Sequence, residues 1–232
     1  MREIVLDTET TGFDPESGDR IVEIGAVELH NHVPTGRVYH QYINPERSMP
    51  QGAFEVHGLG DAFLADKPVF AAIAQEFLDF VGDAHLVIHN AAFDMKFLNA
   101  ELGWVKKRQL PWDQAIDTLA IARKKFPGSP ASLDALCRRF GVDNSSREKH
   151  GALLDSEILA EVYLELIGGR QPDFMLGASS APVGDAGSMG QKTARIRPKK
   201  LPPRITEAEQ TAHRAFVDAL GDDALWRKLD QA

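Results

Sequence analysis

Three short apolar segments follow one another closely near the amino terminus, and this succession constrains the fold more than any other feature. Residues 3–9, 20–29 and 37–43 are apolar or alternate between apolar and polar side chains, as β-strands do. Turn-forming residues separate the segments, and we place the turn between the second and third at residues 34–36, Pro-Thr-Gly. Connections this short join antiparallel neighbours. The segment therefore predicts an antiparallel meander.

Helical spacing replaces this alternation from residue 70 onward. Phe70, Ile73, Phe77, Leu78 and Val81 fall on one face of a helix that starts near a proline. The rest of the pattern predicts a strand at 85–89 and helices at 93–102 (ended by Gly103), 113–125, 132–140 and 153–167. Three strands, a helix, a fourth strand and further helices indicate an α/β fold, a mixed sheet with helices packed against it.

Length and composition exclude several classes of protein. A chain of 232 residues, 43% of them hydrophobic, can bury a core over one domain with an extension or over two small domains. The single cysteine, Cys137, excludes a disulfide framework and a cysteine-cluster zinc site. No apolar run approaches the roughly 20 residues that span a bilayer. Acidic residues occur too early for a secretory signal. We therefore expect a reducing cytoplasm as the setting.

The charge of the chain is unevenly distributed. The net charge is −8 overall, but residues 1–168 hold 16 Lys or Arg against 26 Asp or Glu, and residues 169–232 hold 10 against 8. An acidic body argues against nucleic-acid binding by electrostatics alone. Such a body could still handle phosphates if divalent cations reversed the local charge.

The carboxyl-terminal part has a different pattern. Residues 177–204 are rich in Gly, Ala, Ser and Pro and show no apolar period, which is typical of a flexible linker. Six Lys or Arg and no acid lie in 191–204, where a solvated tether is favoured over a specific nucleic-acid site. A capping box at 206–209 then begins a helix. Its apolar stripe must dock on the body of this chain or on another protein.

Two acidic residues interrupt the first predicted strand. Asp7 and Glu9 are two residues apart, so both carboxylates point to the same side of the sheet. Like charges this close repel each other unless a cation or a proton lies between them. A solvent-facing position would also explain them, but the preceding Ile4-Val5-Leu6 is typical of a buried strand. The pair favours a metal site.

Three more residues are candidates for the same chemistry. Asp94 follows the strand at 85–89 in the first turn of a helix, where it could complement the helix dipole or face a ligand. Asp155 sits among leucines and isoleucines, and a buried carboxylate needs a partner. His150 lies in a polar segment, usually a surface position, and only its proximity to Asp155 makes it a candidate.

These residue types indicate a particular metal chemistry. Carboxylate oxygens without cysteine favour Mg²⁺ or Mn²⁺ over zinc. Four carboxylates could hold two such ions, which clamp the attacking and leaving oxygens of a phosphoryl displacement. A histidine with an ordinary pKa of about 6.5 can accept the proton of the attacking water.

Three motifs in this order resemble those of the DEDDh family of 3′→5′ exonucleases. They are Asp7-Thr8-Glu9-Thr10-Thr11-Gly12, His89-Asn90-Ala91-Ala92-Phe93-Asp94 and His150-Gly151-Ala152-Leu153-Leu154-Asp155. The chain is most similar to the members that proofread for bacterial DNA polymerase III. The resemblance implies a ribonuclease-H-like fold, with a mixed five-stranded sheet flanked by helices. It also implies removal of mismatched nucleotides from a DNA 3′ end as nucleoside 5′-monophosphates.

The resemblance also implies roles for individual residues. Asp7, Glu9, Asp94 and Asp155 match the carboxylates that hold two divalent cations, Mg²⁺ or Mn²⁺, and His150 matches the general base. The segment Val56-His57-Gly58-Leu59 is similar to the substrate loop of the family, so His57 would touch the terminal nucleotide. The substrate-binding set implied in this way is Asp7, Thr8, Glu9, His57 and Asp155.

The expected organisation is an exonuclease domain at 1–168, a flexible linker at 169–205 and a helical tail at 206–232. The tail resembles the segment that binds the polymerase alpha subunit. Residues 171–176 resemble peptides that bind the bacterial sliding clamp, through Gln171, Phe174 and Leu176. Binding of a small third subunit is left open.

Two rival functions remain at this point. One is a free-standing exonuclease of the same family that trims RNA or repairs DNA, although a free enzyme needs neither linker nor tail. The other is a catalytically idle scaffold in a polymerase assembly, which the complete carboxylate set disfavours. The favoured setting is the cytoplasmic, nucleoid-associated replisome of a bacterium.

Overall fold

The computed structural model describes residues 1–145, 149–168 and 205–221. The chain divides into two units, Met1–Leu176 and Gly177–Ala232, and each is described by itself. Residues 169–204 of the predicted linker (169–205) lie outside the described residues, as does the tail beyond 221. The predicted clamp-binding residues Gln171, Phe174 and Leu176 are among those not described. Within the described part, no helix is both long and apolar enough to cross a membrane.

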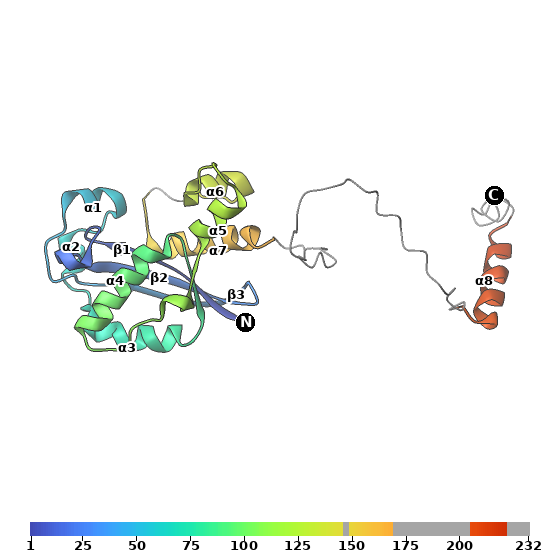
Figure 1. The fold of residues 1–232 in the computed structure, drawn as a ribbon, viewed down its shortest axis with the longest axis horizontal. Helices are drawn as coiled ribbons and strands as arrows, with labels where there is room; N and C mark the ends of the chain where they lie inside the picture. The colour runs from blue at the N-terminus through green and yellow to red at the C-terminus, as the bar shows by residue number, and fades with distance from the viewer. Residues whose placement is uncertain (146–148, 169–204, 222–232) are drawn as a thin grey trace, which may run out of the picture. The chain divides into compact units, whose positions relative to one another are not determined.

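A five-stranded sheet in the order β3-β2-β1-β4-β5 forms the centre of the first unit (Figure 1). The antiparallel meander is confirmed, since β2 pairs antiparallel with both β1 and β3. β4 pairs parallel with β1 and with β5, which makes the sheet mixed. The strands are β1 (Arg2–Thr10), β2 (Ile21–His30), β3 (Val33–Tyr42), β4 (His85–Ile88) and β5 (Ala115–Asp117).

Helices cover both faces of this sheet (Figure 1). Those of the first unit are η1 (Pro15–Ser17), α1 (Gln51–His57), α2 (Asp61–Leu64), α3 (Phe70–Val81), α4 (Ala91–Trp104), η2 (Trp112–Gln114), α5 (Thr118–Lys125), α6 (Leu133–Phe140) and α7 (Ala152–Leu166). The predicted helices at 70–81, 132–140 and 153–167 are confirmed within one or two residues at each end. α4 continues one residue past Gly103, the residue at which we expected it to end.

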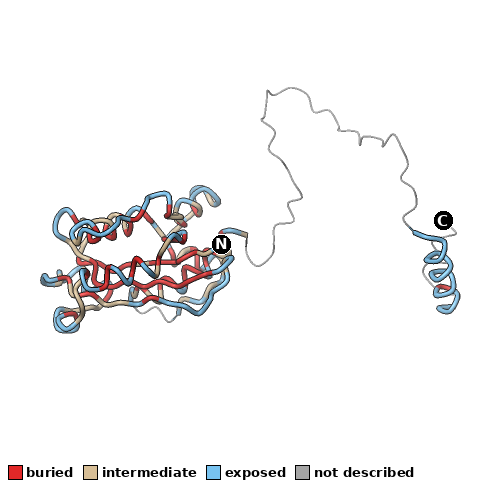
Figure 2. Tube along the Cα trace, turned by 90° about the horizontal axis from the view of Figure 1, so that it is seen from below, coloured by how far each residue is buried: buried red, intermediate tan, exposed pale blue. Residues whose placement is uncertain are grey.

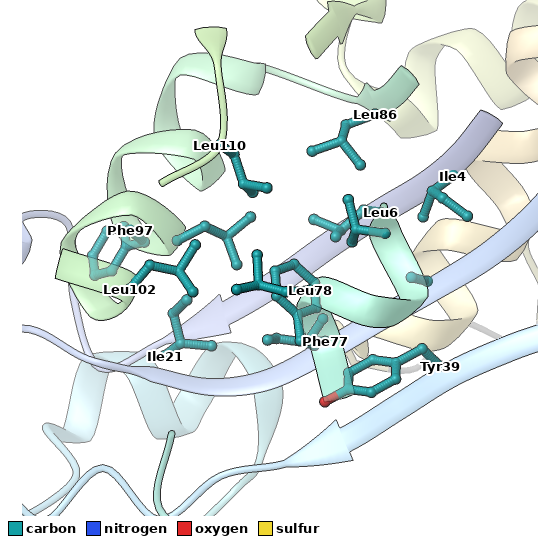
Figure 3. Close-up of a cluster of buried hydrophobic side chains, with 14 of the residues drawn as sticks. Ile4, Leu6, Ile21, Tyr39, Phe77, Leu78, Leu86, Phe97, Leu102 and Leu110 are labelled. Atoms are coloured by element: carbon teal, nitrogen blue, oxygen red, sulfur yellow. The ribbon is translucent and has the colours of Figure 1, made fainter. Parts of the chain in front are cut away.

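Two hydrophobic clusters lie on opposite faces of the sheet because successive side chains of a strand alternate. Ile4 and Leu6 of β1 belong to the cluster that includes Phe77 and Phe97 (Figure 3). Val5 belongs to the other cluster, which includes residues of α6 and α7. The central strands are accordingly buried, and the exposed positions lie at the periphery (Figure 2). β1 is therefore fixed on both faces, and residues at its end have a defined position.

Two local predictions were wrong. The turn between β2 and β3 is made by Asn31 and His32, both with positive φ, and the Pro-Thr-Gly segment at 34–36 lies inside β3. A proline is tolerated there because β3 is an edge strand. The region expected as a helix from 113 contains η2 and β5 before α5 begins. A strand of three residues is too short to show a period.

The second unit contains α8 (Glu207–Ala219) within its described residues. The predicted capping box is confirmed. The Thr206 hydroxyl accepts from the Glu209 N–H at 3.3 Å, and the Glu209 carboxylate accepts from the Thr206 N–H at 2.8 Å. The apolar stripe is exposed, with Phe216 at 62% of its maximal accessibility.

Candidate active site

The carboxyl end of β1 meets the start of α4 because β1 and β4 run parallel. Asn90, with φ 71° and ψ 53° in the left-handed region, turns the chain between β4 and α4. Its N–H donates to Asp117 Oδ1 at 3.2 Å. This turn places Asp94 in the first turn of α4, as predicted, at the same end of the sheet as Asp7 and Glu9.

Asp94 is held from the neighbouring strand. The Thr8 hydroxyl donates to Asp94 Oδ1 at 2.7 Å, and only 3% of Asp94 is exposed. Burial raises the pKa of Asp94 to about 7, and the Thr8 hydrogen bond opposes that rise. A carboxylate in this position is expensive to keep charged unless a cation lies nearby.

α7 approaches the sheet most closely at Gly25. A Cβ at Gly25 would lie 2.1 Å from the Leu153 nitrogen, so only glycine fits. The Ser156 hydroxyl donates to the Gly25 carbonyl at 2.9 Å, and Gly25 is the register partner of Asp7 in β1. This contact brings the first turn of α7, and Asp155 with it, beside Asp7. Sequence reasoning missed Gly25, although a glycine inside an apolar strand is a signal of close backbone approach.

A cavity of about 680 Å³ lies where these elements meet. All five residues expected to carry the chemistry line it, namely Asp7, Glu9, Asp94, His150 and Asp155, together with Thr8. One ligand atom each from Glu9, His150 and Asp155 lies within 4.8 Å of the others. Glu9 and Asp155 are buried, whereas half of the His150 side chain is exposed, with Nδ1 3.7 Å from Asp155 Oδ2. Convergent buried carboxylates fit hard divalent cations.

A second cavity of about 530 Å³ adjoins the first. The two share Thr8, Glu9, Phe13 and Phe93, and the second extends to His57 at the end of α1. The segment expected as a substrate loop is thus partly helical, because His57 is the last residue of α1 and Gly58 caps it. The lining of the second cavity is predominantly apolar, which suits a base or a sugar better than a phosphate.

His57 is buried at the wall of the second cavity. Its Nδ1 accepts from the Leu59 N–H at 3.0 Å, and its buried Nε2 has no well-formed hydrogen bond among the described residues. Burial lowers the pKa of His57, and the Lys149 charge acts in the same direction. An interaction with the backbone of Thr10, which also lines the second cavity, opposes this lowering of the pKa.

The segment that carries His150 packs against α1. The His150 N–H donates to the Val56 carbonyl at 3.3 Å. The Lys149 ammonium lies 5.3 Å from the centre of the Phe54 ring, and a Cβ at Gly58 would come within 2.9 Å of Lys149 Cδ. The two candidate histidines are therefore positioned by the same short helix.

Nine lining residues of the first cavity were not among the predicted site residues, and three of them bear on its chemistry. Phe13 is 89% exposed and borders both cavities. His89 lies 2.9 Å through Nδ1 from the Thr118 hydroxyl, which donates to the Ile88 carbonyl at 3.2 Å. Arg123 comes from α5. The sequence analysis gave His89 only as the first residue of the second motif, and nothing in the local pattern distinguished Phe13 or Arg123.

Known proteins resemble the chain over nearly its full length. The exonuclease family (RNase_T) matches residues 4–163. The DNA polymerase III subunit epsilon of Rickettsia felis is 50% identical, over 95% of this chain and 97% of the relative. The subunit of the same name from Escherichia coli K12 is 46% identical, over 97% of each chain.

Solved structures share the fold at lower identity. Exonuclease X in complex with 5′ overhanging duplex DNA has a TM-score of 0.56 and 24% identity, covering 71% of this chain and 90% of that chain. The nuclease domain of 3′hExo, a DEDDh family member bound to rAMP, has a TM-score of 0.61 and 20% identity, covering 72% and 91%. These similarities confirm the ribonuclease-H-like exonuclease fold.

Proposed function

Because the chain belongs to the exonuclease family, and within it to the DNA polymerase III epsilon subunits, we propose that the cavity lined by Asp7, Asp94 and Asp155 is its catalytic centre. The chain is a 3′→5′ exonuclease that proofreads for DNA polymerase III. One observation carries the assignment of the centre: acidic side chains from three distant segments converge, largely buried, on one cavity beside His150.

The donor set fits two divalent cations. Asp7, Glu9, Asp94 and Asp155 would hold Mg²⁺ or Mn²⁺ through carboxylate oxygens. When bound, the two ions supply polarisation of the phosphodiester and stabilisation of the charge that develops on the leaving oxygen. Their binding also explains why buried carboxylates gather here, since like charges this close repel each other.

His150 acts as the general base. Its side chain is half exposed, so it can reach a water molecule and later lose the proton to solvent. The Asp155 carboxylate at 3.7 Å stabilises the imidazolium that forms. The water oxygen attacks phosphorus and the bond from phosphorus to the upstream 3′ oxygen breaks. A nucleoside 5′-monophosphate leaves, and the released 3′ oxygen takes a proton from solvent and becomes the 3′ hydroxyl of the shortened strand.

Thr8 and His57 position the substrate. The Thr8 hydroxyl fixes the orientation of Asp94 through its 2.7 Å hydrogen bond, and the backbone around Thr8 lies against the terminal nucleotide. The apolar second cavity receives the terminal nucleoside, with His57 Nε2 available to it. A mismatched end unpairs at lower cost than a matched one and reaches the cavity more often. Selectivity for mismatches follows without any reading of sequence.

The tail connects this enzyme to its polymerase. We assign residues 1–168 to the exonuclease, 169–205 to a linker and 206–232 to the segment that binds the polymerase alpha subunit. The exposed stripe of α8, with Phe216 and Leu220 at 62% and 50% exposure, has the apolar character of a docking helix. Residues 171–176 are proposed to bind the sliding clamp. The assembly works at the cytoplasmic replisome.

The similarity to epsilon subunits spans 95% or more of the chain, so it includes the linker and the tail. A free-standing nuclease would need neither. The polymerase alpha subunit should therefore be retained by the full chain and lost when residues 206–232 are deleted. Retention by the truncated chain would contradict the assignment of the tail.

A pair of variants on one helix tests the catalytic centre. Asp155 is buried on the cavity, and Glu157, two residues along α7, is exposed outside it. Asp155→Asn should abolish Mg²⁺-dependent release of 5′-monophosphates from a single-stranded 3′ end. Glu157→Gln should retain it, and EDTA should stop both the wild type and Glu157→Gln. Equal activity of the two variants would overturn the assignment.

A further inference from the structure

The catalytic cavity is strongly acidic but carries one strong cation on its wall. Within the described part of the chain, Arg123 is the only lysine or arginine that lines it. The acidic lining residues are Asp7, Glu9, Asp94, Asp134 and Asp155. A guanidinium beside five carboxylates would be expected to pair with one of them.

Arg123 makes no such pair. Its side chain is exposed, and it forms no hydrogen bond or ion pair with the residues described in the structure. Arg20, by contrast, is paired with Glu101 at 2.8 Å and 2.9 Å. Asp134, on the same wall, accepts from Asn144 at 3.0 Å. The Arg123 guanidinium is therefore available to a ligand.

Arg123 shares the cavity wall with His89. Burial is the main cause of the lowered pKa of His89, and the charge of Arg123 acts in the same direction. The two side chains are therefore close enough to interact at this wall.

Sheet order determines which part of a substrate could meet this charge. β1 lies in the middle of the order β3-β2-β1-β4-β5. The second cavity extends from β1 to α1, which follows β3, whereas Arg123 belongs to α5, which follows β5. Figure 1 shows α1 and α5 apart from each other, above different parts of the sheet. The carboxylates lie between these two sides.

A DNA strand therefore has one direction in which it fits. With its terminal nucleoside in the second cavity and the scissile phosphate at the carboxylates, the rest of the strand extends toward α5. Each upstream nucleotide brings a phosphate, and a guanidinium can donate two parallel hydrogen bonds to a phosphate.

We propose that Arg123 binds a phosphate of the DNA strand upstream of the scissile bond. This inference rests on the proposed function and deepens it. Arg123 is a positioning residue in this scheme: its contact keeps the strand in line across an otherwise repulsive acidic surface, and it carries no sequence information.

A length series tests the proposal with the full chain. The substrates are oligothymidylates of two to five nucleotides without a 5′ phosphate, so the dinucleotide has only the scissile phosphate. In the wild type, kcat/KM should rise as upstream phosphates are added. In Arg123→Gln this gain should shrink about tenfold. Lys124→Gln is the matched control, because it removes the same charge from the next residue of α5, which does not line the cavity.

Salt provides an independent readout. One phosphate contact to a single strand contributes about 0.7 to the slope of log affinity against log salt. At fixed Mg²⁺, the slope for log kcat/KM of the pentanucleotide should fall by about 0.7 in Arg123→Gln. It should be unchanged in Lys124→Gln, and Arg123→Lys, which keeps the charge, should restore it.

The outcomes separate the inference from the function on which it rests. An inactive wild type would refute the proposed function. An active wild type with the same length gain and salt slope in Arg123→Gln would refute only the role of Arg123. An equal loss on the dinucleotide and the pentanucleotide would also refute it, because Arg123 would then act at the scissile phosphate or on folding.

Discussion

Strand β1 carries buried carboxylates at both ends, and the surroundings of these carboxylates differ between the two ends. At the start of the strand, Glu3 is completely buried. It accepts from the Tyr163 hydroxyl at 2.8 Å and from the His32 N–H at 3.2 Å, and His32 Nδ1 lies 2.8 Å away. At the other end, Asp7 and Glu9 face Asp94 and Asp155 across a cavity.

The difference shows that burial alone does not mark a functional acid. Glu3 is more buried than any of the cavity carboxylates, yet hydroxyl and N–H groups satisfy it, so it serves the fold. The cavity carboxylates converge on one cavity, and like charges gathered in this way repel each other unless cations lie between them. The two ends should therefore respond in opposite ways to substitution.

Asp7→Ala should give the largest effect on activity. Loss of a carboxylate that we propose holds cations should lower kcat/KM for single-stranded DNA at least about a thousandfold, or about 4 kcal/mol. The free energy of unfolding in EDTA should fall by less than about 1 kcal/mol, because one of several like charges is removed. Exonuclease assays and urea titrations measure the two quantities. A large loss of stability with retained activity would give Asp7 the structural role that we assign to Glu3, and would contradict the comparison.

His150→Gln sharpens the division within the catalytic end. Loss of the proposed general base should lower kcat about a hundredfold or more. Mn²⁺ affinity, measured by calorimetry, should change by less than about threefold if the carboxylates alone hold the cations. Because a ring nitrogen of His150 lies within 4.8 Å of carboxylate oxygens of Glu9 and Asp155, a large fall in Mn²⁺ affinity would instead identify it as a ligand and contradict its role as the base.

Gly25→Ala should disturb the catalytic end from outside the cavity. The added methyl group would meet the backbone of α7 at 2.1 Å, so α7 must move and Asp155 with it. A displacement of about 1 Å can cost up to about a hundredfold in rate, and overpacking costs about 1–3 kcal/mol in stability. Gly103→Ala is the control, because its methyl group would meet only the end of the Gln109 side chain at 3.1 Å and Gly103 lines neither cavity. Equal kcat in the two variants would show that the close approach does not position Asp155.

The sequence predicts the residues of the site better than the contacts that hold them. The motifs carry Asp7, Asp94 and Asp155, and strand or helix spacing gives each a face, so their placement on one cavity followed. The three-residue β5 has no detectable period, and the positive φ of Asn31 and His32 has no glycine to indicate it. Gly25 packs closely against α7, and Arg123 of α5 lines the cavity. In both cases the position depends on segments far away in the sequence, which local patterns do not report.

Tyr163→Phe should give the smallest effect, confined to the structural end of β1. The substitution removes the hydroxyl that donates to Glu3 at 2.8 Å and leaves that buried carboxylate with the His32 contacts. The free energy of unfolding should fall by about 1–3 kcal/mol, the cost of a lost hydrogen bond to a buried charge. Because Tyr163 lies in α7 and outside the cavity lining, kcat/KM should stay within about twofold of the wild type. Urea titration measures the free energy of unfolding and the exonuclease assay measures kcat/KM, and together they show whether only stability falls or both quantities fall. A loss of both stability and activity would mean that the contact between Tyr163 and Glu3 also positions α7, and with it Asp155. The two ends of β1 would then be structurally coupled.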